Sequence, residues 1–330
     1  MSTPQRRTNS GFGPRTTAAE VIAGTDLSGR TVIVTGGYSG LGLETVRALA
    51  GAGAHPVVPA RRPDHARAAL ADAGLGGDAV EVDELDLADL ESVAAFAERF
   101  LATGRPLAIL INNAAVMACP ETRVGDGWEA QLATNHLGHF ALTNRLWPAL
   151  AAANGARVVA LSSTGHKLSP FRFDDPWFRE RPYDKWQAYG QAKTANSLFA
   201  VRLDALGRDH GVRAFAVHPG GIMTPLQRHL TREEMIVSGW MDEEGNLHER
   251  FKTVEQGAAT SVWAATSTAL DGEGGVYCED CDVADPTEVG SPEARIRGVD
   301  AHAIDPDAAA RLWAWSAEVT GVDAFAGAPS

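Results

Sequence analysis

Short apolar runs alternate with longer segments of helical period along almost the whole chain. This alternation is typical of βαβ units, in which each strand is followed by a helix that packs on a shared sheet. Several runs, such as TVIVTG and RVVAL, are mainly apolar and β-branched, as expected of parallel strands buried on both faces. The sequence therefore predicts an α/β fold, a single doubly wound domain with about seven parallel strands flanked by helices. The predicted strands lie at residues 31–36, 56–60, 79–87, 107–115, 157–163, 212–220 and 274–279.

The domain organisation follows from what interrupts this pattern. A chain of 330 residues, of which 45 % are hydrophobic, is long enough for one large domain or for two. Neither a Pro/Ser-rich linker nor a change of composition divides it after residue 30, so we expect one domain over residues 16–330. Residues 1–15 are polar and rich in Gly and Pro, with three arginines and no acidic residue, and they predict a flexible N-terminal arm.

The overall charge excludes several kinds of partner. Lys and Arg number 29 against 42 Asp and Glu, which gives a formal net charge of -13. Such a surface repels nucleic-acid phosphates and anionic lipids, so neither is expected as a partner. The sequence has no apolar run near the roughly 20 residues that a membrane helix needs, and its first residues lack the apolar core of a signal peptide. With three cysteines in a chain of this length, we expect a cytoplasmic protein.

Cysteine and histidine residues can indicate a metal or redox centre. Cys278 and Cys281 form one CxxC motif, but a single pair cannot complete a tetrahedral zinc site. His136 and His139 lie three residues apart on a predicted buried helix, and together with His166 they are more typical of packing or capping. We therefore predict no metal site, and a metal or redox role for the CxxC motif is the weaker alternative.

A glycine-rich turn follows the first predicted strand. Its sequence, TGGYSGLG, places Gly36, Gly40 and Gly42 directly before a predicted helix. Glycines permit a tight turn and a close approach of backbone to a pyrophosphate, while free amides at the helix start bind anionic oxygens. The order strand, turn and helix is that of a dinucleotide-binding Rossmann domain. A turn with a purely conformational role is the alternative.

The end of the second predicted strand bears on which nicotinamide cofactor binds. An NAD site usually places an acidic residue there against the ribose 2′-hydroxyl, whereas this sequence has Arg61. An arginine attracts a 2′-phosphate, and Ser39 in the glycine-rich turn adds a hydroxyl donor. The sequence therefore predicts NADP(H). Asp64 keeps NAD(H) as the alternative, in which Arg61 and Arg62 are ordinary solvated charges.

Tyr189 and Lys193 lie four residues apart in a predicted helix, so their side chains share one face. A tyrosine with the ordinary pKa of about 10 transfers protons poorly near neutrality. An ammonium group within roughly 4–6 Å favours the phenolate and lowers that pKa. The spacing therefore predicts a pair in which Lys193 lowers the pKa of Tyr189.

Five motifs occur in an order shared with one enzyme family. They are TGGYSGLG, NNAA at residues 112–115, Ser162–Ser163, YGQAK at residues 189–193 and Pro219–Gly220. Over residues 25–320 the chain resembles the short-chain dehydrogenases/reductases, and TNHLGHFALTNRLWPAL with YDKWQAYGQAK resembles the branch of retinol dehydrogenases and WW-domain oxidoreductases. The resemblance implies hydride transfer between NADP(H) and a carbonyl or alcohol, with the cofactor at the carboxyl ends of the strands. It also implies a homodimer or homotetramer.

The same resemblance assigns residues to the cofactor. Asp86 and Leu87 are expected to flank the adenine, and Thr224 to contact the carboxamide. Ala115 stands where the family has glycine, which adds a methyl group near the nicotinamide ribose. The full expected set is Gly36, Tyr38, Ser39, Gly40, Leu41, Gly42, Arg61, Asp86, Leu87, Asn113, Ala114, Ala115, Tyr189, Lys193, Pro219, Gly220, Ile222 and Thr224.

The catalytic set implied by the resemblance is Asn135, Ser163, Tyr189 and Lys193. Tyr189 donates or accepts the proton, and Ser163 donates a hydrogen bond to the oxygen on which charge develops. Ser162 is the alternative serine, because adjacent side chains on a strand face opposite ways. Lys193 is also expected to hold the nicotinamide ribose, and the backbone carbonyl of Asn135 to hold a water that connects Lys193 to solvent.

Two segments are predicted to close over the substrate. Residues 166–188 carry several aromatic side chains, among them Phe171 and Trp177, and residues 224–256 mix Met and Trp with charges. They favour an apolar, medium-to-large substrate, unless the same aromatics pack under an oligomer interface. Two other functions stay open: an NADPH-dependent reductase of a carbon–carbon double bond, and a non-catalytic NADP(H)-binding regulator.

Overall fold

Eight strands form one sheet in the order β10-β9-β8-β7-β4-β1-β2-β3 within residues 4–327, the part of the chain that the computed structural model describes. Neighbouring strands are parallel except β9 and β10, which are antiparallel. The bounds are β1 Thr31–Val34, β2 His55–Ala60, β3 Glu81–Glu84, β4 Ile109–Asn112, β7 Arg157–Leu161, β8 Arg213–His218, β9 Val276–Glu279 and β10 Asp282–Val283. The predicted α/β fold with seven parallel strands is confirmed.

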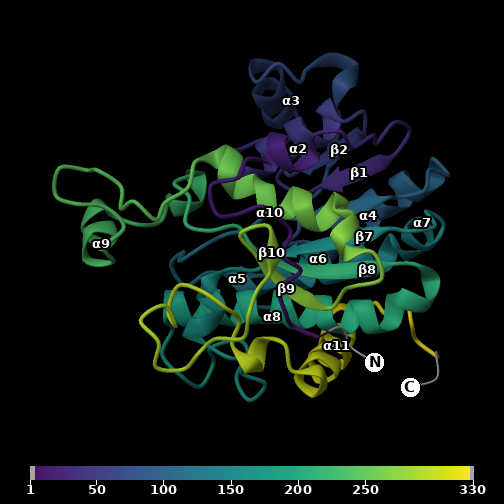
Figure 1. The fold of residues 1–330 in the computed structure, drawn as a ribbon. Helices are drawn as coiled ribbons and strands as arrows, with labels where there is room; N and C mark the ends of the chain where they lie inside the picture. Colours follow the sequence, from purple (N-terminus) through teal and green to yellow (C-terminus); the bar gives the residue numbers. More distant parts are fainter. Residues whose placement is uncertain (1–3, 328–330) are drawn as a thin grey trace.

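Helices cover both faces of the sheet (Figure 1). One face carries α1, α2 and α10, and the other carries α4, α6, α8 and α11. The bounds of these helices and of the remaining α-helices are α1 Ala18–Ile22, α2 Gly40–Gly51, α3 Pro63–Asp72, α4 Leu90–Ala102, α5 Ala130–Leu132, α6 Gly138–Arg145, α7 Trp147–Ala151, α8 Lys185–Gly207, α9 Arg232–Val237, α10 Val254–Thr266 and α11 Pro306–Thr320. Figure 1 shows α9 standing away from the body of the protein.

Strand β1 shows why both faces are apolar. Val32 and Val34 pack into a core cluster that includes Trp263 of α10, whereas Ile33 packs into the opposite cluster with Phe140 of α6. Successive side chains of a strand point to opposite faces, so a strand covered on both sides is apolar at every position. This explains why continuous apolar runs located the strands correctly.

Three short strands were not predicted from the sequence. Strand β10 contains two residues and follows a tight turn in which Asp280 and Cys281 have φ values of 50° and 58°. Strands β5 (Arg123–Val124) and β6 (Trp128–Glu129) form a separate two-stranded sheet. Two residues are too few to show the apolar periodicity on which the prediction relied.

The N-terminal segment runs along the β10 edge of the sheet. The Gln5 side chain donates to the carbonyls of Tyr277 and Ala284 at 2.7 and 2.6 Å, and accepts from the Tyr277 amide at 3.0 Å. The carboxylate of Asp282 accepts from the backbone amides of Thr8 and Asn9 at 2.7 and 3.1 Å. Composition does not reveal such partners, which lie far away in the sequence. The flexibility predicted for residues 1–15 stays a prediction. Residues 1–3 of that arm lie outside the described residues.

No helix among residues 4–327 is long and apolar enough to cross a membrane. Cys119, Cys278 and Cys281 are free thiols and buried. Across the same residues, no group of three or more His, Cys, Asp or Glu side chains is arranged to hold a metal ion. Burial raises the pKa of the Cys281 thiol to about 11, so this thiol is protonated near neutrality.

Candidate functional site

A cavity of about 930 Å³ opens at the carboxyl ends of the parallel strands. Its walls come from the segments that follow β1, β4, β7 and β8, from the first turns of α8, and from residues 224–252 and 279–297. Strand order reverses between β1 and β4, so the connections after these two strands run to opposite sides and leave a crevice. The cavity therefore lies where doubly wound folds bind their ligands.

The glycine-rich turn forms the floor of the cavity on the β1 side. Gly36 has φ of 65°, a left-handed value that favours glycine. A Cβ atom on Gly42 would lie 2.3 Å from the carbonyl oxygen of Gly36, so a side chain there would force the turn open. Helix α2 starts at Gly40, and its first amides face this space. These features match the geometry of the predicted cradle, and the binding of anionic oxygens there stays a prediction.

The outer end of the cavity is lined by polar and aromatic residues after β1 and β2. Tyr38 and Ser39 come from the glycine-rich turn, Arg61 and Arg62 from the end of β2, and His65 from α3. Arg61 is exposed, so its guanidinium is available to a ligand. The rings of Tyr38 and His65 meet edge to face at 5.9 Å between centroids.

Two residues expected at the adenine lie outside this wall. Leu87 is buried in the core, and its carbonyl oxygen would be 2.2 Å from a Cβ atom on Gly138. The Asp86 carboxylate accepts from the amide of Ala88 at 2.9 Å and so closes a local turn. Neither residue is among those that line the cavity. The expected set otherwise converges there: the remaining sixteen positions all line it.

A buried network holds the segment after β4. The hydroxyl of Thr35 accepts from the amides of Asn113 and Ala114 at 2.9 and 3.0 Å. The same hydroxyl lies 2.8 Å from Nε2 of His139, whose Nδ1 lies 3.0 Å from the carbonyl oxygen of Asn135. A carbonyl only accepts, so Nδ1 carries the proton and Thr35 donates to Nε2. Burial lowers the pKa of His139 to about 4, which keeps the ring neutral.

Asn135 is completely buried in a π-helical turn, Ala133–Leu137. Its side chain accepts from the amide of Val116 at 2.8 Å and donates to the carbonyl of Val116 at 2.9 Å. Asn135 thus braces the segment after β4 and lies behind the cavity wall. Its carbonyl oxygen lies 3.0 Å from Nδ1 of His139. The expected water on this carbonyl stays a prediction.

The two adjacent serines after β7 have different surroundings. The hydroxyl of Ser162 donates to the carbonyl of Lys193 at 2.9 Å and accepts from Ser197 at 2.8 Å, so it ties β7 to α8. Ser163 caps a 3-10 helix, Thr164–Leu168, and its Oγ accepts from the amide of Gly165 at 3.0 Å. Ser163 also lies beside Tyr189: a Cβ atom on Gly165 would be 3.4 Å from Oγ of Ser163 and 2.8 Å from Cε1 of Tyr189. Ser163 is therefore the serine placed beside the tyrosine.

Tyr189 and Lys193 of α8 both line the cavity, with Nζ of Lys193 5.5 Å from the centre of the Tyr189 ring. Burial raises the pKa of Tyr189 to about 12, and the hydrogen bond with Ser163 lowers it only in part. Burial also lowers the pKa of Lys193 to about 7. Its Nζ donates to the carbonyl of Leu161 at 2.8 Å. The expected lowering of the Tyr189 pKa by Lys193 was wrong, because burial raises this pKa and the influence that lowers it comes from Ser163.

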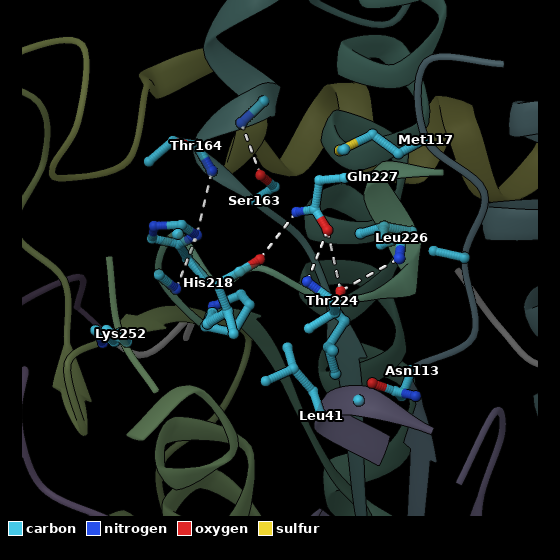
Figure 2. A pocket seen from close by; sticks show the side chains of 18 of the residues that line it. Leu41, Asn113, Met117, Ser163, Thr164, His218, Thr224, Leu226, Gln227 and Lys252 are labelled. Atoms are coloured by element: carbon cyan, nitrogen blue, oxygen red, sulfur yellow. Dashed lines mark hydrogen bonds between the residues drawn. The ribbon is translucent and has the colours of Figure 1, made fainter. Parts of the chain in front are cut away.

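The segment after β8 is held by Gln227, which the sequence analysis missed. Gln227 accepts from the amide of Thr224 at 2.9 Å and donates to the carbonyl of Ile222 at 2.9 Å. Figure 2 shows this side chain reaching back over the loop toward Thr224. The sequence TPLQ contained the signal, since a Thr followed three residues later by Gln is a capping box.

Apolar side chains line the cavity around Tyr189. Met117, Ala118 and Tyr189 form a cluster against which Trp186, Leu226, Leu230 and Trp240 pack. The Trp186 ring lies edge to face with Trp240 at 5.9 Å and with Tyr189 at 6.4 Å. Part of each expected lid segment, residues 166–188 and 224–256, therefore contributes to the wall.

Most aromatics of residues 166–188 lie elsewhere. Phe171 and Trp177 pack against Trp315 of α11 at 5.0 and 5.3 Å between ring centres. They join the core beneath α11, so the idea that they form a flap over the substrate was wrong. The sequence did not reveal this, because the covering helix follows more than a hundred residues later.

A family profile described as short chain dehydrogenase matches residues 30–235 of the chain. The chain belongs to this family. A "Probable oxidoreductase" from Streptomyces lividans is 48 % identical to it over 297 residues, which are 89 % of this chain and 98 % of that protein. Retinol dehydrogenase 12 from Homo sapiens is 38 % identical over 299 residues, 90 % of this chain and 88 % of that one. The chain is therefore an oxidoreductase of the retinol-dehydrogenase-like branch.

A solved structure adds the cofactor of one relative. The crystal structure of a protein from Beutenbergia cavernae, with NADP bound at low occupancy, superposes with a TM-score of 0.61 and 26 % identity. The match covers 77 % of this short-chain dehydrogenase and 96 % of that chain. These similarities agree with the geometry, in which a glycine-rich turn and an apolar compartment share one cavity.

Proposed function

We propose that this short-chain dehydrogenase transfers hydride between NADP(H) and a carbonyl or alcohol, with Ser163, Tyr189 and Lys193 as catalytic residues and Asn135 in support. One observation carries the proposal. The glycine-rich turn at Gly36–Gly42 and the neighbouring side chains of Ser163 and Tyr189 line the same cavity. Neither part alone requires redox chemistry, but together they support a function in which a nucleotide binds beside a proton donor.

The residues around the turn fit a nicotinamide dinucleotide. The missing side chains at Gly36 and Gly42 let the turn pack closely on itself and on Asn113, and the amides at the start of α2 would then hold a pyrophosphate. Arg61 and Ser39 would hold a 2′-phosphate, which favours NADP(H) over NAD(H). Asn113 and Thr224 line the opposite end, where the nicotinamide ribose and carboxamide would lie. When bound, the cofactor supplies or accepts the hydride.

The protein's own part in the reaction is to bind the substrate oxygen and move a proton. In reduction the neutral phenol of Tyr189 donates its proton to the oxygen, and the Ser163 hydroxyl donates a second hydrogen bond. The Gly165 amide already occupies one lone pair of Ser163 Oγ, so the hydroxyl proton stays available for donation. Lys193 would position the cofactor ribose and stabilise the phenolate after transfer.

The lining near Tyr189 favours an apolar substrate of medium to large size. Met117, Trp186, Leu226 and Trp240 offer aliphatic and aromatic surface within one cluster. Such surface contributes affinity through burial, about 25 cal/mol per Å². Cytoplasmic location and assembly into a homodimer or homotetramer are further proposals, supported by the three free thiols and by the family resemblance respectively.

A direct test measures NADPH consumption over a panel of aromatic and aliphatic ketones, aldehydes and quinones, with NADP+ reduction on the matching alcohols. We expect turnover of apolar members and a loss of at least about 100-fold in kcat for Tyr189→Phe. The matched control is Tyr183→Phe, whose hydroxyl contacts Cys119 and Gln131. Near-normal turnover by Tyr189→Phe would contradict the mechanism, and reduction of carbon–carbon double bonds alone would redirect the function.

A further inference from the structure

His218 ends β8 and lies between two turns that border the cavity. It is 9 % exposed and forms part of the cavity wall. Its Nδ1 accepts from the amide of Thr164 at 3.3 Å and from the amide of Gly220 at 3.5 Å. Figure 2 shows the ring between Thr164 and the turn that follows β8, with both contacts drawn. One ring nitrogen thus serves the ends of two strands, β7 and β8.

The contacts define the state of the ring. Both partners are N–H donors, so Nδ1 must present a lone pair and the single proton lies on Nε2. Burial, together with the charge of Lys252, lowers the pKa of His218 to about 3, which agrees with a neutral ring. Asp280 acts in the opposite direction and His166 and Lys167 in the same direction as Lys252. The acceptor at Nδ1 is therefore present throughout the neutral range.

The first turn carries the proposed catalytic serine. Thr164 follows Ser163 and starts the 3-10 helix that Ser163 caps. The next two amides return to Ser163: Gly165 donates to its Oγ at 3.0 Å and His166 to its carbonyl at 3.0 Å. The Thr164 amide is the one that points across to β8. The position of the Thr164 amide therefore determines where the Ser163 hydroxyl lies relative to β8.

The second turn, Pro219–Gly221, is held from the other side by Lys252. A Cβ atom on Gly220, whose φ is 102°, would lie 2.7 Å from Cδ and Cε of Lys252. The Lys252 amide donates to the carbonyl of Gly221 at 2.8 Å, and its Nζ pairs with Asp280 at 2.7 Å. This turn is therefore clamped on its outer side, and His218 supplies the contact on its inner side.

We propose that His218 is a positioning residue, which sets the spacing between the Ser163 turn and the Pro219–Gly221 turn through the single acceptor Nδ1. The inference rests on the proposed function, because only then do these turns hold the catalytic serine and the nicotinamide end of the cofactor. His218 touches neither reacting atom in this role. It acts by holding two backbone amides at one point.

A role in packing alone makes the opposite prediction for two substitutions. Leucine fills a buried histidine site with apolar volume but offers no acceptor, so it suits packing. Asparagine is smaller and polar, but its Oδ1 stands where Nδ1 stands and accepts from both amides. If His218 positions the two turns, kcat of His218→Asn should exceed that of His218→Leu. If His218 serves packing alone, the order should be reversed. His218→Gln places its amide group one bond farther out and serves as the matched polar control.

The experiment measures kcat, KM for NADPH and melting temperature for the three variants and the unaltered protein. We expect His218→Leu to lose on the order of 10- to 100-fold in kcat, since small displacements of reacting groups have effects of this size. His218→Asn should recover most of that loss and His218→Gln should not. A kcat of His218→Leu equal to or above that of His218→Asn overturns the proposal. If His218→Leu does not fold, kcat of His218→Asn is compared with that of His218→Gln. A kcat of His218→Gln equal to or above that of His218→Asn then overturns the proposal.

A second readout separates this inference from the proposed function. Hydrogen–deuterium exchange of peptides over residues 163–166 and 218–222 reports the two amides without any turnover. We expect both peptides to exchange at least about 10-fold faster in His218→Leu and near the original rate in His218→Asn. Unchanged exchange in His218→Leu overturns the positioning role even in an active enzyme. If the protein turns over no carbonyl substrate but shows the expected exchange pattern, the contacts of His218 with the two amides are supported and the proposed function is contradicted.

Discussion

Nζ of Lys193 donates to the backbone carbonyl of Leu161 at 2.8 Å, although the Lys193 side chain is buried. The same carbonyl accepts from Asn196 at 2.9 Å. A buried ammonium that faces a carbonyl, with no carboxylate partner within ion-pair distance among the described residues, is costly. This cost explains why the pKa of Lys193 falls to about 7, and it makes the site sensitive to pH.

Lys193→Met should stabilise the protein at low pH while abolishing activity. The Lys193 pKa is about 7 in the fold and near its ordinary value of 10.5 when unfolded, so between these values the unfolded chain binds more protons. Stability therefore rises with pH across this window, and falls as the pH drops toward 7. Melting temperatures at pH 6 and pH 10 measure the effect. The gain from Lys193→Met should be larger at pH 6, and a pH-independent gain would contradict the depressed pKa.

Ser163→Ala and Ser162→Ala should separate catalysis from stability. Removing the Ser163 hydroxyl takes away a donor to the substrate oxygen, so we expect kcat to fall by about 100-fold or more. Removing the Ser162 hydroxyl breaks its hydrogen bonds with the Lys193 carbonyl and with the Ser197 hydroxyl, which keeps only the longer contact to that carbonyl at 3.3 Å. This loss should lower the free energy of unfolding by about 1–3 kcal/mol. Steady-state kinetics and urea denaturation measure both. Equal losses of kcat in the two variants would show that the serines were assigned wrongly.

Arg61→Ala should change the choice of cofactor. The exposed guanidinium lines the cavity where a 2′-phosphate would lie, so its removal should raise KM for NADPH by roughly 10-fold and leave KM for NADH nearly unchanged. Arg67→Ala is the control, since Arg67 lies on α3 and pairs with Asp64 at 2.8 Å. An unaltered ratio of the two KM values in Arg61→Ala would contradict selection of NADP(H) by this residue.

Trp240→Ala should weaken binding of large apolar ketones more than small ones. Trp240 packs with Trp186 and the Met117 cluster, so truncation removes aromatic surface from one wall of the compartment. We expect kcat/KM for a two-ring aryl ketone to fall by about 10- to 100-fold, with a smaller change for acetone. Val237→Ala is the matched control on the same segment, because Val237 is 89 % exposed. A uniform loss for both ketones would place Trp240 outside the substrate wall.

Thr35→Val should loosen the segment after β4. The Thr35 hydroxyl donates to His139 and accepts from the amides of Asn113 and Ala114, and valine matches its shape without these bonds. The Ala114 amide and Nε2 of His139 lose their partner, whereas the Asn113 amide keeps the carbonyl of Ile111 at 3.0 Å. The free energy of unfolding should therefore fall by about 1–3 kcal/mol, and KM for the cofactor should rise. Thermal denaturation and a titration with NADPH test the two effects separately.

Sequence reasoning found the parts of the site that are local in the chain. The glycine-rich turn and the four-residue spacing of Tyr189 and Lys193 depend on neighbouring residues, and both line the cavity as expected. The hydrogen bonds that hold the site residues in place were harder to predict, because they join residues that are distant in the sequence. Thr35 and His139, for example, are 104 positions apart. Burial also changed the electrostatics, raising the Tyr189 pKa where spacing alone suggested the reverse.

The N-terminal segment leaves little of the outer sheet edge open. Gln5 continues the ladder beyond the end of β10 by pairing with both backbone groups of Tyr277, and Asp282 takes up the amides of Thr8 and Asn9. Exposed strand edges are the places where a further strand adds most easily. A second copy of the chain could add a strand at this edge only after residues 5–10 had been displaced from it. Any self-association through that side of the molecule would have to exchange these segments between copies or proceed through helix faces.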